Sequence, residues 1–223
     1  MKHGSYQNQS SLLNDNCYPH VISTPSFAGT CITAPSFFDG FWKSVNNIKL
    51  EEITMIPAVK IDLSGIIQEG GKISAEHIKA FERESGDIRP KSFLIIYTGW
   101  SKNWSAEKRK YIKKYPILTK DAAEYIVSKK VFGIGMDTPL PDNKNTDFQV
   151  QDILFTNGMY IVKNLSENTE KITEKFGHVI ISPMKFDGCN EAPARVIFFV
   201  ENESDMPIID GIKKRFNKLF GIR

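Results

Sequence analysis

The chain has 223 residues, a hydrophobic fraction of 41% and a formal net charge of +3 at pH 7. This length and composition suit one globular domain with a sizeable core. Basic and acidic residues are interspersed, whereas nucleic-acid-binding proteins concentrate basic residues on one face, so we expect no nucleic-acid partner. The one basic cluster of note, at residues 108–114, is predicted to be a solvated helix face.

The predicted elements alternate between strands and helices. Weak alternation and β-branched residues at 18–32 predict strands, and the aromatic-rich segment 37–49 predicts a packed loop followed by a short helix. The apolar run at 56–63 predicts a buried strand. Ser74 is the predicted N-cap of a helix that continues to Glu84.

The second half continues this alternation. Residues 91–98 (KSFLIIYT) give the strongest strand signal, and residues 119–130 predict a helix with an acid in its first turn and lysines in its last. The remaining predicted elements are a strand at 131–136, a helix at 148–155 and strands at 159–162, 177–184 and 195–200. Strands that are apolar on both faces and alternate with helices predict a layered α/β fold.

The cysteines and the apolar pattern bear on location. Cys17, Cys31 and Cys189 show no CxxC spacing, which fits a reducing compartment. No apolar run reaches the roughly 18 residues of a membrane span. Residues 1–16 are polar and lack a signal-peptide core. We therefore expect a cytoplasmic protein without a membrane partner, with a polar arm at 1–16 and one domain at 17–223.

Six short motifs follow one another in a defined order. They are GTxxxxP at 29–35, IDLS at 61–64, YTGW at 97–100, GIGMDT at 133–138, DILFTNGMYIVKNL at 152–165 and NEAPARV at 190–196. Their order and spacing, over roughly residues 18–200, resemble the cyclase family that includes bacterial kynurenine formamidase and isatin hydrolase. The resemblance implies that family's swivelling β/β/α fold as a single layered domain, and a homodimer.

The family's hallmark is HxGTHxDxPxH, whose histidines and aspartate bind divalent metal. Gly29, Thr30 and Pro35 match, but the metal and proton-transfer positions fall on Phe27, Cys31, Thr33 and Phe37, and two later ligand positions fall on Gln151 (or Asp152, if the register slips by one) and Lys163. Phenyl rings offer no lone pair, threonine and glutamine are weak neutral ligands, and an ammonium repels a dication. We therefore expect no metal, no cofactor and no metal-activated water.

Another chemistry could replace the metal. Cys31 would be the nucleophile, with its thiolate favoured by Lys163, while Thr33 and Gln151 donate hydrogen bonds, so these four are the predicted catalytic residues. In the alternative, Cys31 is a buried unreactive thiol and Lys163 pairs with an acid such as Asp152 or Glu167.

Aromatic residues gather around the same motif. Phe27, Phe37, Phe38, Trp42, Trp100 and Asp137 are the predicted substrate-binding residues of a dry, apolar pocket. Such a pocket could orient a small molecule for reaction. In the alternative the aromatic rings fill the vacated space as core, and Asp137 forms a turn. Arg195 is predicted to form a structural ion pair.

These observations favour a metal-independent cyclase or hydrolase that acts on a small, largely apolar molecule in specialised metabolism. A non-catalytic protein that binds a small molecule or a partner on the same scaffold is the alternative. Metal-dependent amide hydrolysis through other ligands is a third hypothesis.

Overall fold

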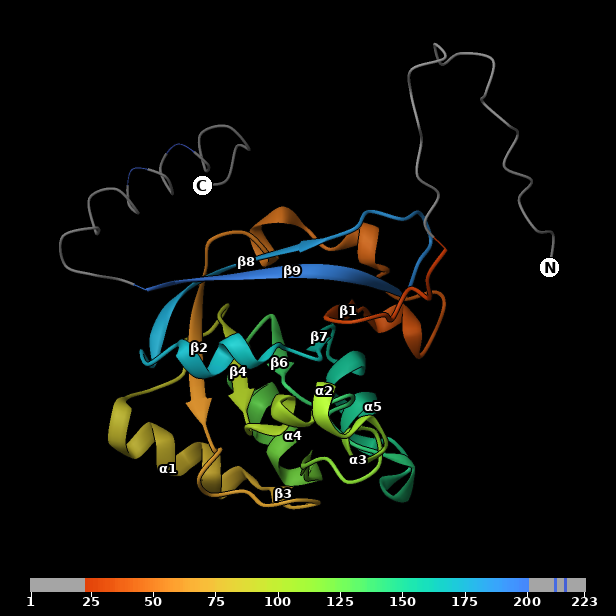
Figure 1. The fold of residues 1–223 in the computed structure, drawn as a ribbon. Helices are drawn as coiled ribbons and strands as arrows, with labels where there is room; N and C mark the ends of the chain where they lie inside the picture. The colour runs from red at the N-terminus through yellow and green to blue at the C-terminus, as the bar shows by residue number, and fades with distance from the viewer. Residues whose placement is uncertain (1–22, 201–210, 212–214, 216–223) are drawn as a thin grey trace, which may run out of the picture.

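The computed structural model describes residues 23–200, 211 and 215, so the predicted arm at 1–16 lies outside the described residues. A closed barrel forms the centre of the described fold (Figure 1). Its strands, in the order in which they are hydrogen-bonded, are β1 (Cys31–Thr33), β7 (Tyr160–Lys163), β6 (Gly133–Met136), β4 (Phe93–Tyr97), β2 (Ile56–Asp62), β8 (Phe176–Pro183) and β9 (Glu191–Val200).

Strands β2, β4, β6 and β7 run parallel, while β1, β8 and β9 pair antiparallel with their neighbours. Glycines in β6 allow the tight packing of this parallel part. A Cβ atom added at Gly133 would lie 2.5 Å from the carbonyl oxygen of Tyr160, and one at Gly135 would lie 2.7 Å from the Phe93 ring. Larger side chains would therefore push β6 away from its neighbours.

Helices cover one side of the sheet (Figure 1). The longest are α1 (Ala75–Ser85), α4 (Lys120–Ser128) and α5 (Gln149–Thr156). The short helices α2 (Asn103–Ala106) and α3 (Lys108–Tyr111) follow β4, and β3 (Lys72–Ile73) pairs in parallel with β5 (Ile117–Leu118). No helix in this described part of the chain has both the length and the apolarity to cross a bilayer.

The alternation of side chains along β4 separates two core layers. Leu94 and Ile96 pack in the layer shared with α1, α4 and α5. Phe93 and Ile95 pack in the barrel interior, where the Phe93 ring stacks on that of Tyr160 with centroids 5.9 Å apart. All five residues of β4 are buried, as its apolar sequence predicts.

The predicted α/β fold is confirmed, as are the helices after Ser74 and Thr119. Of the strands predicted across 18–32, the part at 31–32 is confirmed, since β1 begins at Cys31, but the part at 23–30 is wrong: residues 23–25 belong to no regular element and residues 26–30 form turns and bends. Gly29 has a φ of +67°, which bends the chain just before β1. Strand β9 begins at Glu191 rather than at residue 195, because residues 191–193 pair with β1.

Candidate functional site

Strand β1 brings the predicted catalytic positions together. Ile32 packs into the barrel interior, so Cys31 and Thr33 face the other way. Cys31 is in register with Lys163 of β7, and Thr33 is in register with Glu191 of β9. Groups from three strands far apart in the sequence therefore meet on one face of the sheet.

An ion pair occupies this face. The Nζ of Lys163 donates a hydrogen bond to Oε1 of Glu191, and the hydroxyl of Thr33 donates to the same oxygen at 2.9 Å. All three residues are buried, and Lys163 Nζ also lies 5.8 Å from the centre of the exposed Phe37 ring. The bonds from Lys163 and Thr33 offset part of the cost of burying the charges.

The partner of Lys163 is therefore Glu191, and the alternative partners Asp152 and Glu167 are wrong. Both of those acids are exposed, whereas β9 holds Glu191 beside β1. The sequence indicated that Lys163 needs an acidic partner but not which acid it is. A lysine in a buried strand needs a counter-ion, and Glu191 lies inside the NEAPARV motif.

Cys31 is fully buried, with 0% of its surface exposed, and its thiol lies 3.6 Å from the carbonyl oxygen of Phe27. Burial raises the pKa of the Cys31 thiol to about 11, although Lys163 acts to lower that pKa. The predicted activation by Lys163 is therefore outweighed, and the thiol stays protonated at neutral pH. This environment is typical of the unreactive thiol that was the alternative.

Gln151 contributes to the start of helix α5. Its Nε2 donates to Oδ1 of the buried Asp142 at 2.7 Å, and Asp142 Oδ2 accepts the backbone N–H groups of Val150 and Gln151 at 2.8 and 3.3 Å. Burial raises the pKa of Asp142 while these bonds lower it. The amide of Gln151 is therefore engaged by a helix-capping carboxylate.

Asp137 organises the turn after β4. Its Oδ1 accepts from the backbone N–H and the hydroxyl of Thr98, both at 2.8 Å, and its Oδ2 accepts from the backbone N–H of Ser101 at 3.1 Å. Burial raises the pKa of Asp137, against the lowering effect of these bonds. Trp100, in the same turn, is buried, and its indole N–H donates to the carbonyl oxygen of Tyr111 at 2.9 Å.

The predicted phenylalanines lie at the surface. Phe27, Phe37 and Phe38 are 57%, 43% and 46% exposed, and the last two lie with ring centres 6.3 Å from that of Phe155 on α5. Trp42 is partly buried against the core under the helices. The cavities described below are lined by other residues, so the binding role of these four stays a prediction.

A cavity of about 420 Å³ opens beside Tyr111, and its volume is typical of a small-molecule site. It lies past the carboxyl ends of β4 and β7, the edge at which α/β sheets gather their ligands. The residues that line it are Gly29, Thr30, Ser101, Trp104, Ser105, Tyr111, Asn164, Leu165, Ser166 and Glu167.

The wall of this cavity is tied together by Asn164. The Tyr111 hydroxyl lies 2.9 Å from Asn164 Oδ1 and 3.2 Å from the carbonyl oxygen of Asp137. Asn164 Nδ2 donates to the carbonyl of Gly29 at 2.8 Å, and the Asn164 carbonyl accepts from the Thr30 hydroxyl at 2.6 Å. The backbone of Asn164 is left-handed, with a φ of +56°. These bonds hold one wall of the cavity, including Tyr111, in place.

Trp104 and Ser101 complete the wall of this cavity. The Trp104 ring meets the Tyr111 ring edge-on, with centroids 5.0 Å apart. The Ser101 hydroxyl is buried at the wall and has no well-formed hydrogen bond within the described residues, although the buried hydroxyl of Tyr97 lies close enough for Ser101 to lower its pKa. Sequence reasoning missed Ser101, Trp104, Tyr111 and Asn164. Trp104 could have been found from its spacing of four residues after Trp100.

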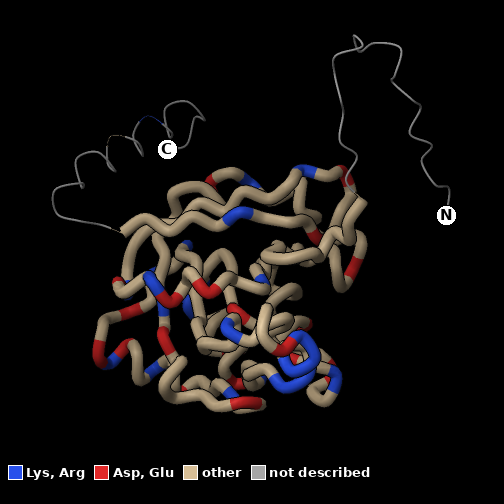
Figure 2. The backbone as a smooth tube through the Cα atoms, viewed as in Figure 1, with Lys and Arg blue, Asp and Glu red and all other residues tan. Residues whose placement is uncertain are grey.

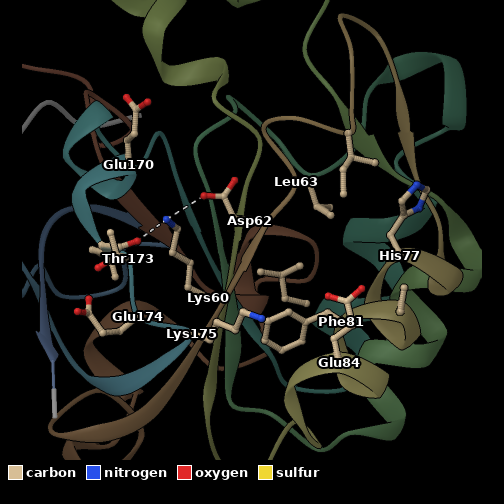
Figure 3. A pocket seen from close by; sticks show the side chains of 14 residues that line it. Lys60, Asp62, Leu63, His77, Phe81, Glu84, Glu170, Thr173, Glu174 and Lys175 are labelled. Atoms are coloured by element: carbon tan, nitrogen blue, oxygen red, sulfur yellow. Dashed lines mark hydrogen bonds and ion pairs between the residues drawn. The ribbon is translucent and has the colours of Figure 1, made fainter. Parts of the chain in front are cut away.

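A separate cavity of about 400 Å³ lies between the end of β2, helix α1 and residues 170–175 (Figure 3). His77 lines it together with the charged residues Lys60, Asp62, Glu84, Glu170, Glu174 and Lys175. Lys60 is buried and satisfied, since its Nζ pairs with Asp62 at 3.1 Å and donates to the carbonyl of Ile172 at 2.6 Å. This charged rim fits a largely apolar ligand less well than the cavity beside Tyr111 does.

The basic cluster at 108–114 gathers at one corner of the molecule, around α3 (Figure 2). Lys110 and Lys114 both pair with Glu69, at 3.3 and 2.9 Å, and Lys108 and Arg109 are exposed. The cluster is thus a solvated face that is partly neutralised by an acid.

The residues at the family's metal positions do not fit a divalent metal. The ammonium of Lys163 lies at one of the positions that the resemblance assigns to metal ligands, and it pairs with Glu191. The hydroxyl of Thr33, at another of these positions, donates a hydrogen bond to Glu191. Within residues 23–200, 211 and 215, no three His, Cys, Asp or Glu side chains are grouped so as to hold a metal ion.

Comparisons with known proteins agree with the motif resemblance. The model of the family described as "Putative cyclase" matches residues 5–143. Isatin hydrolase of Roseibium aggregatum is 24% identical over 180 residues, which cover 76% of this chain and 67% of that protein. An uncharacterised protein of Methanocaldococcus jannaschii is 27% identical over 133 residues, 60% of this chain and 65% of its own. The chain thus spans about two thirds of the length of these two curated relatives.

The fold agrees as well. The structure of isatin hydrolase A from Labrenzia aggregata bound to benzyl benzoate superposes with a TM-score of 0.73 at 24% identity, over 82% of this chain and 77% of that chain. This similarity shows the fold, and it confirms the predicted cyclase-like α/β domain.

Proposed function

This chain belongs to the cyclase family, whose fold supports a cyclase or a hydrolase, and we propose that it is a metal-independent member that acts on a small, largely apolar molecule. One observation carries the proposal. A buried ammonium–carboxylate pair stands at the family's metal positions, while an aromatic-walled cavity lies beside it. The proposed site is therefore the cavity lined by Trp104 and Tyr111.

The lining suits catalysis by orientation. Trp104 offers aromatic surface to an apolar ligand, with the buried Tyr111 ring packed edge-on against it. The Ser101 hydroxyl is buried in the same wall beside the hydroxyl of Tyr97, and the proposal requires it to turn toward a bound ligand and donate a hydrogen bond. Burial raises the pKa of Tyr111 far above its ordinary value, so this hydroxyl stays protonated and keeps Asn164 in place. Holding reacting groups together in such a cavity accelerates cyclisation without metal-activated water.

A specific observation supports a second candidate, a non-catalytic small-molecule-binding protein. Each of the four side chains predicted to be catalytic is engaged elsewhere. Cys31 is buried and protonated, Thr33 and Lys163 bond to Glu191, and Gln151 bonds to Asp142. The second candidate uses the same cavity and differs only in the absence of turnover.

Turnover separates the two candidates. We would screen small esters, lactones and amides with chelator-treated protein, and then compare Ser101→Ala with Ser128→Ala, a matched change at an exposed serine on α4. The proposal expects chelator-insensitive turnover that falls at least about tenfold in Ser101→Ala and is unchanged in Ser128→Ala. Activity that is lost with chelator and regained with Mn²⁺ or Zn²⁺ contradicts metal independence. Binding without turnover supports the second candidate.

The proposal includes a cellular setting. We propose a cytoplasmic homodimer that serves specialised metabolism, with no nucleic-acid or membrane partner. The dimer is supported by the family resemblance, and light scattering of the full chain measures it directly.

A further inference from the structure

A larger cavity adjoins the proposed site. It has a volume of about 630 Å³ and lies between β9 and residues 165–172. Thr30, Leu165 and Ser166 line both this cavity and the one beside Tyr111. The two spaces are therefore neighbours that share one wall.

Seven of the twelve residues that line the larger cavity are apolar. Ile95, Val196 and Phe198 reach it from the layer of side chains that fills the barrel, and Leu165, Ile172, Ala194 and Ile197 complete its apolar lining. Thr30, Ser166, Asn168 and Thr169 add neutral polar groups. An aliphatic chain gains free energy from burial against such a surface, at about 0.8 kcal/mol per methylene.

One charge stands at this cavity. Among the described residues that line it, Arg195 is the one that carries a charge. Arg195 is exposed on β9 opposite Ser182 of β8. No ion pair joins it to an acid among the described residues, so the structural ion pair predicted for Arg195 stays a prediction. A guanidinium that has no acidic partner within residues 23–200, beside a cavity with apolar lining, fits a ligand that carries both a carboxylate and an aliphatic chain.

We propose that the ligand of this protein is an elongated aliphatic carboxylate that spans both cavities. Its carboxylate pairs with Arg195, and its chain crosses Leu165 between the larger cavity and the space beside Tyr111. This inference rests on the proposed function for the location of the site, and it names the chemical class of the substrate.

Calorimetric titration with dodecanoate, below the concentration at which it forms micelles, tests the charge and the chain separately. Dodecanoate should bind at least about tenfold more tightly than hexanoate, because six further methylenes are buried. Arg195→Gln should weaken dodecanoate binding about tenfold and leave dodecanol binding unchanged. Arg89→Gln, a change at an exposed arginine before β4, is the matched control and should alter neither. Equal dodecanoate affinity in Arg195→Gln and the unaltered protein overturns the inference.

A second variant tests the path between the cavities. Ser166 is exposed and lines both spaces, so Ser166→Trp should obstruct the shared wall without disturbing the core. Dodecanoate affinity should fall in this variant, while hexanoate affinity is retained. If both affinities are unchanged, the ligand does not span both cavities. If dodecanoate does not bind as expected, the carboxylate inference fails, but chelator-insensitive turnover of short substrates would still support the proposed function. Metal-dependent turnover would contradict the proposed function, whether or not dodecanoate binds.

Discussion

Lys163 of β7 and Glu191 of β9 form a buried ion pair across β1, the strand that lies between theirs. Thr33 of β1 donates a hydrogen bond to the same carboxylate oxygen. The pair thus holds three strands together at the point where the barrel closes. The ammonium of Lys163 therefore occupies a position at which relatives are expected to bind a metal ion.

Removing one member of this pair should destabilise the protein strongly. Glu191→Leu leaves a buried ammonium without its partner, and we expect the free energy of unfolding to fall by about 3–5 kcal/mol. Replacing both charges, in Lys163→Met with Glu191→Leu, should restore most of that loss because no buried charge remains. Urea unfolding of the two single variants and the double variant measures the coupling, and additive effects of the single changes would contradict a coupled pair.

Lys163→Glu should create affinity for a divalent cation. The change places a second carboxylate beside that of Glu191, with the thiol of Cys31 on the adjacent strand. Without metal the two carboxylates repel each other, so the variant should unfold at a lower temperature. Added Zn²⁺ or Mn²⁺ should raise the melting temperature of Lys163→Glu alone. The neutral control Lys163→Met should not respond, and a response there would place the metal elsewhere.

Cys31 should be unreactive at neutral pH. In a Cys17→Ser/Cys189→Ser background, iodoacetamide should label the folded protein far more slowly at pH 7.5 than the urea-unfolded chain. This follows because burial raises the pKa of the thiol to about 11 and the reactive species is the thiolate. Rapid labelling of the folded protein would show that the thiol is accessible and ionised.

The same pKa gives a pH dependence of stability. The ordinary pKa of 9.0 applies to the unfolded chain, so between about pH 9 and 11 the folded state keeps the Cys31 proton that the unfolded chain has lost. The contribution of this group is complete below about pH 9 and is lost as the pH rises through 11. Between about pH 9 and 11, the free energy of unfolding of the unaltered protein, measured by urea unfolding at each pH, should therefore decrease more steeply with pH than that of Cys31→Ala.

At Asn164, glycine should cost less stability than alanine, whereas both substitutions should weaken ligand binding. Its φ of +56° strains an alanine, and both changes remove the bonds to Tyr111 and Gly29. We expect Asn164→Ala to lower the free energy of unfolding by about 1–3 kcal/mol and Asn164→Gly by less. Ligand affinity should fall in both, because Tyr111 loses its fixed position. Unchanged affinity would contradict the role given to this wall.

Much of the fold could be predicted from the sequence, because the apolar runs and the helix starts are local signals. The FLIIY run of β4 and the helix that begins after Ser74 depend on residues close together in the chain. Strand β1 was misplaced because its three residues are held by β7 and β9, which no local pattern reveals.

The site was harder to predict for the same reason. The motif gave Cys31, Thr33 and Lys163 as neighbours, and they are. It could not show that Glu191 completes the group, since that depends on the register of β9 against β1. Nor could it show how far the phenylalanines are exposed, because exposure depends on which surface the segment at 35–38 covers.

The closure of the barrel by β1 has a consequence for how the chain folds. Thr33 and Glu191, which meet at the closing strand, are separated by 158 positions in the sequence. Contacts between such distant residues carry a large loop-closure entropy and form slowly. During synthesis β1 leaves the ribosome early but cannot be paired on either side until β7 and β9 have emerged. Until then β1 is a short segment with both edges unpaired, and both edges can be paired only after β9 has been synthesised.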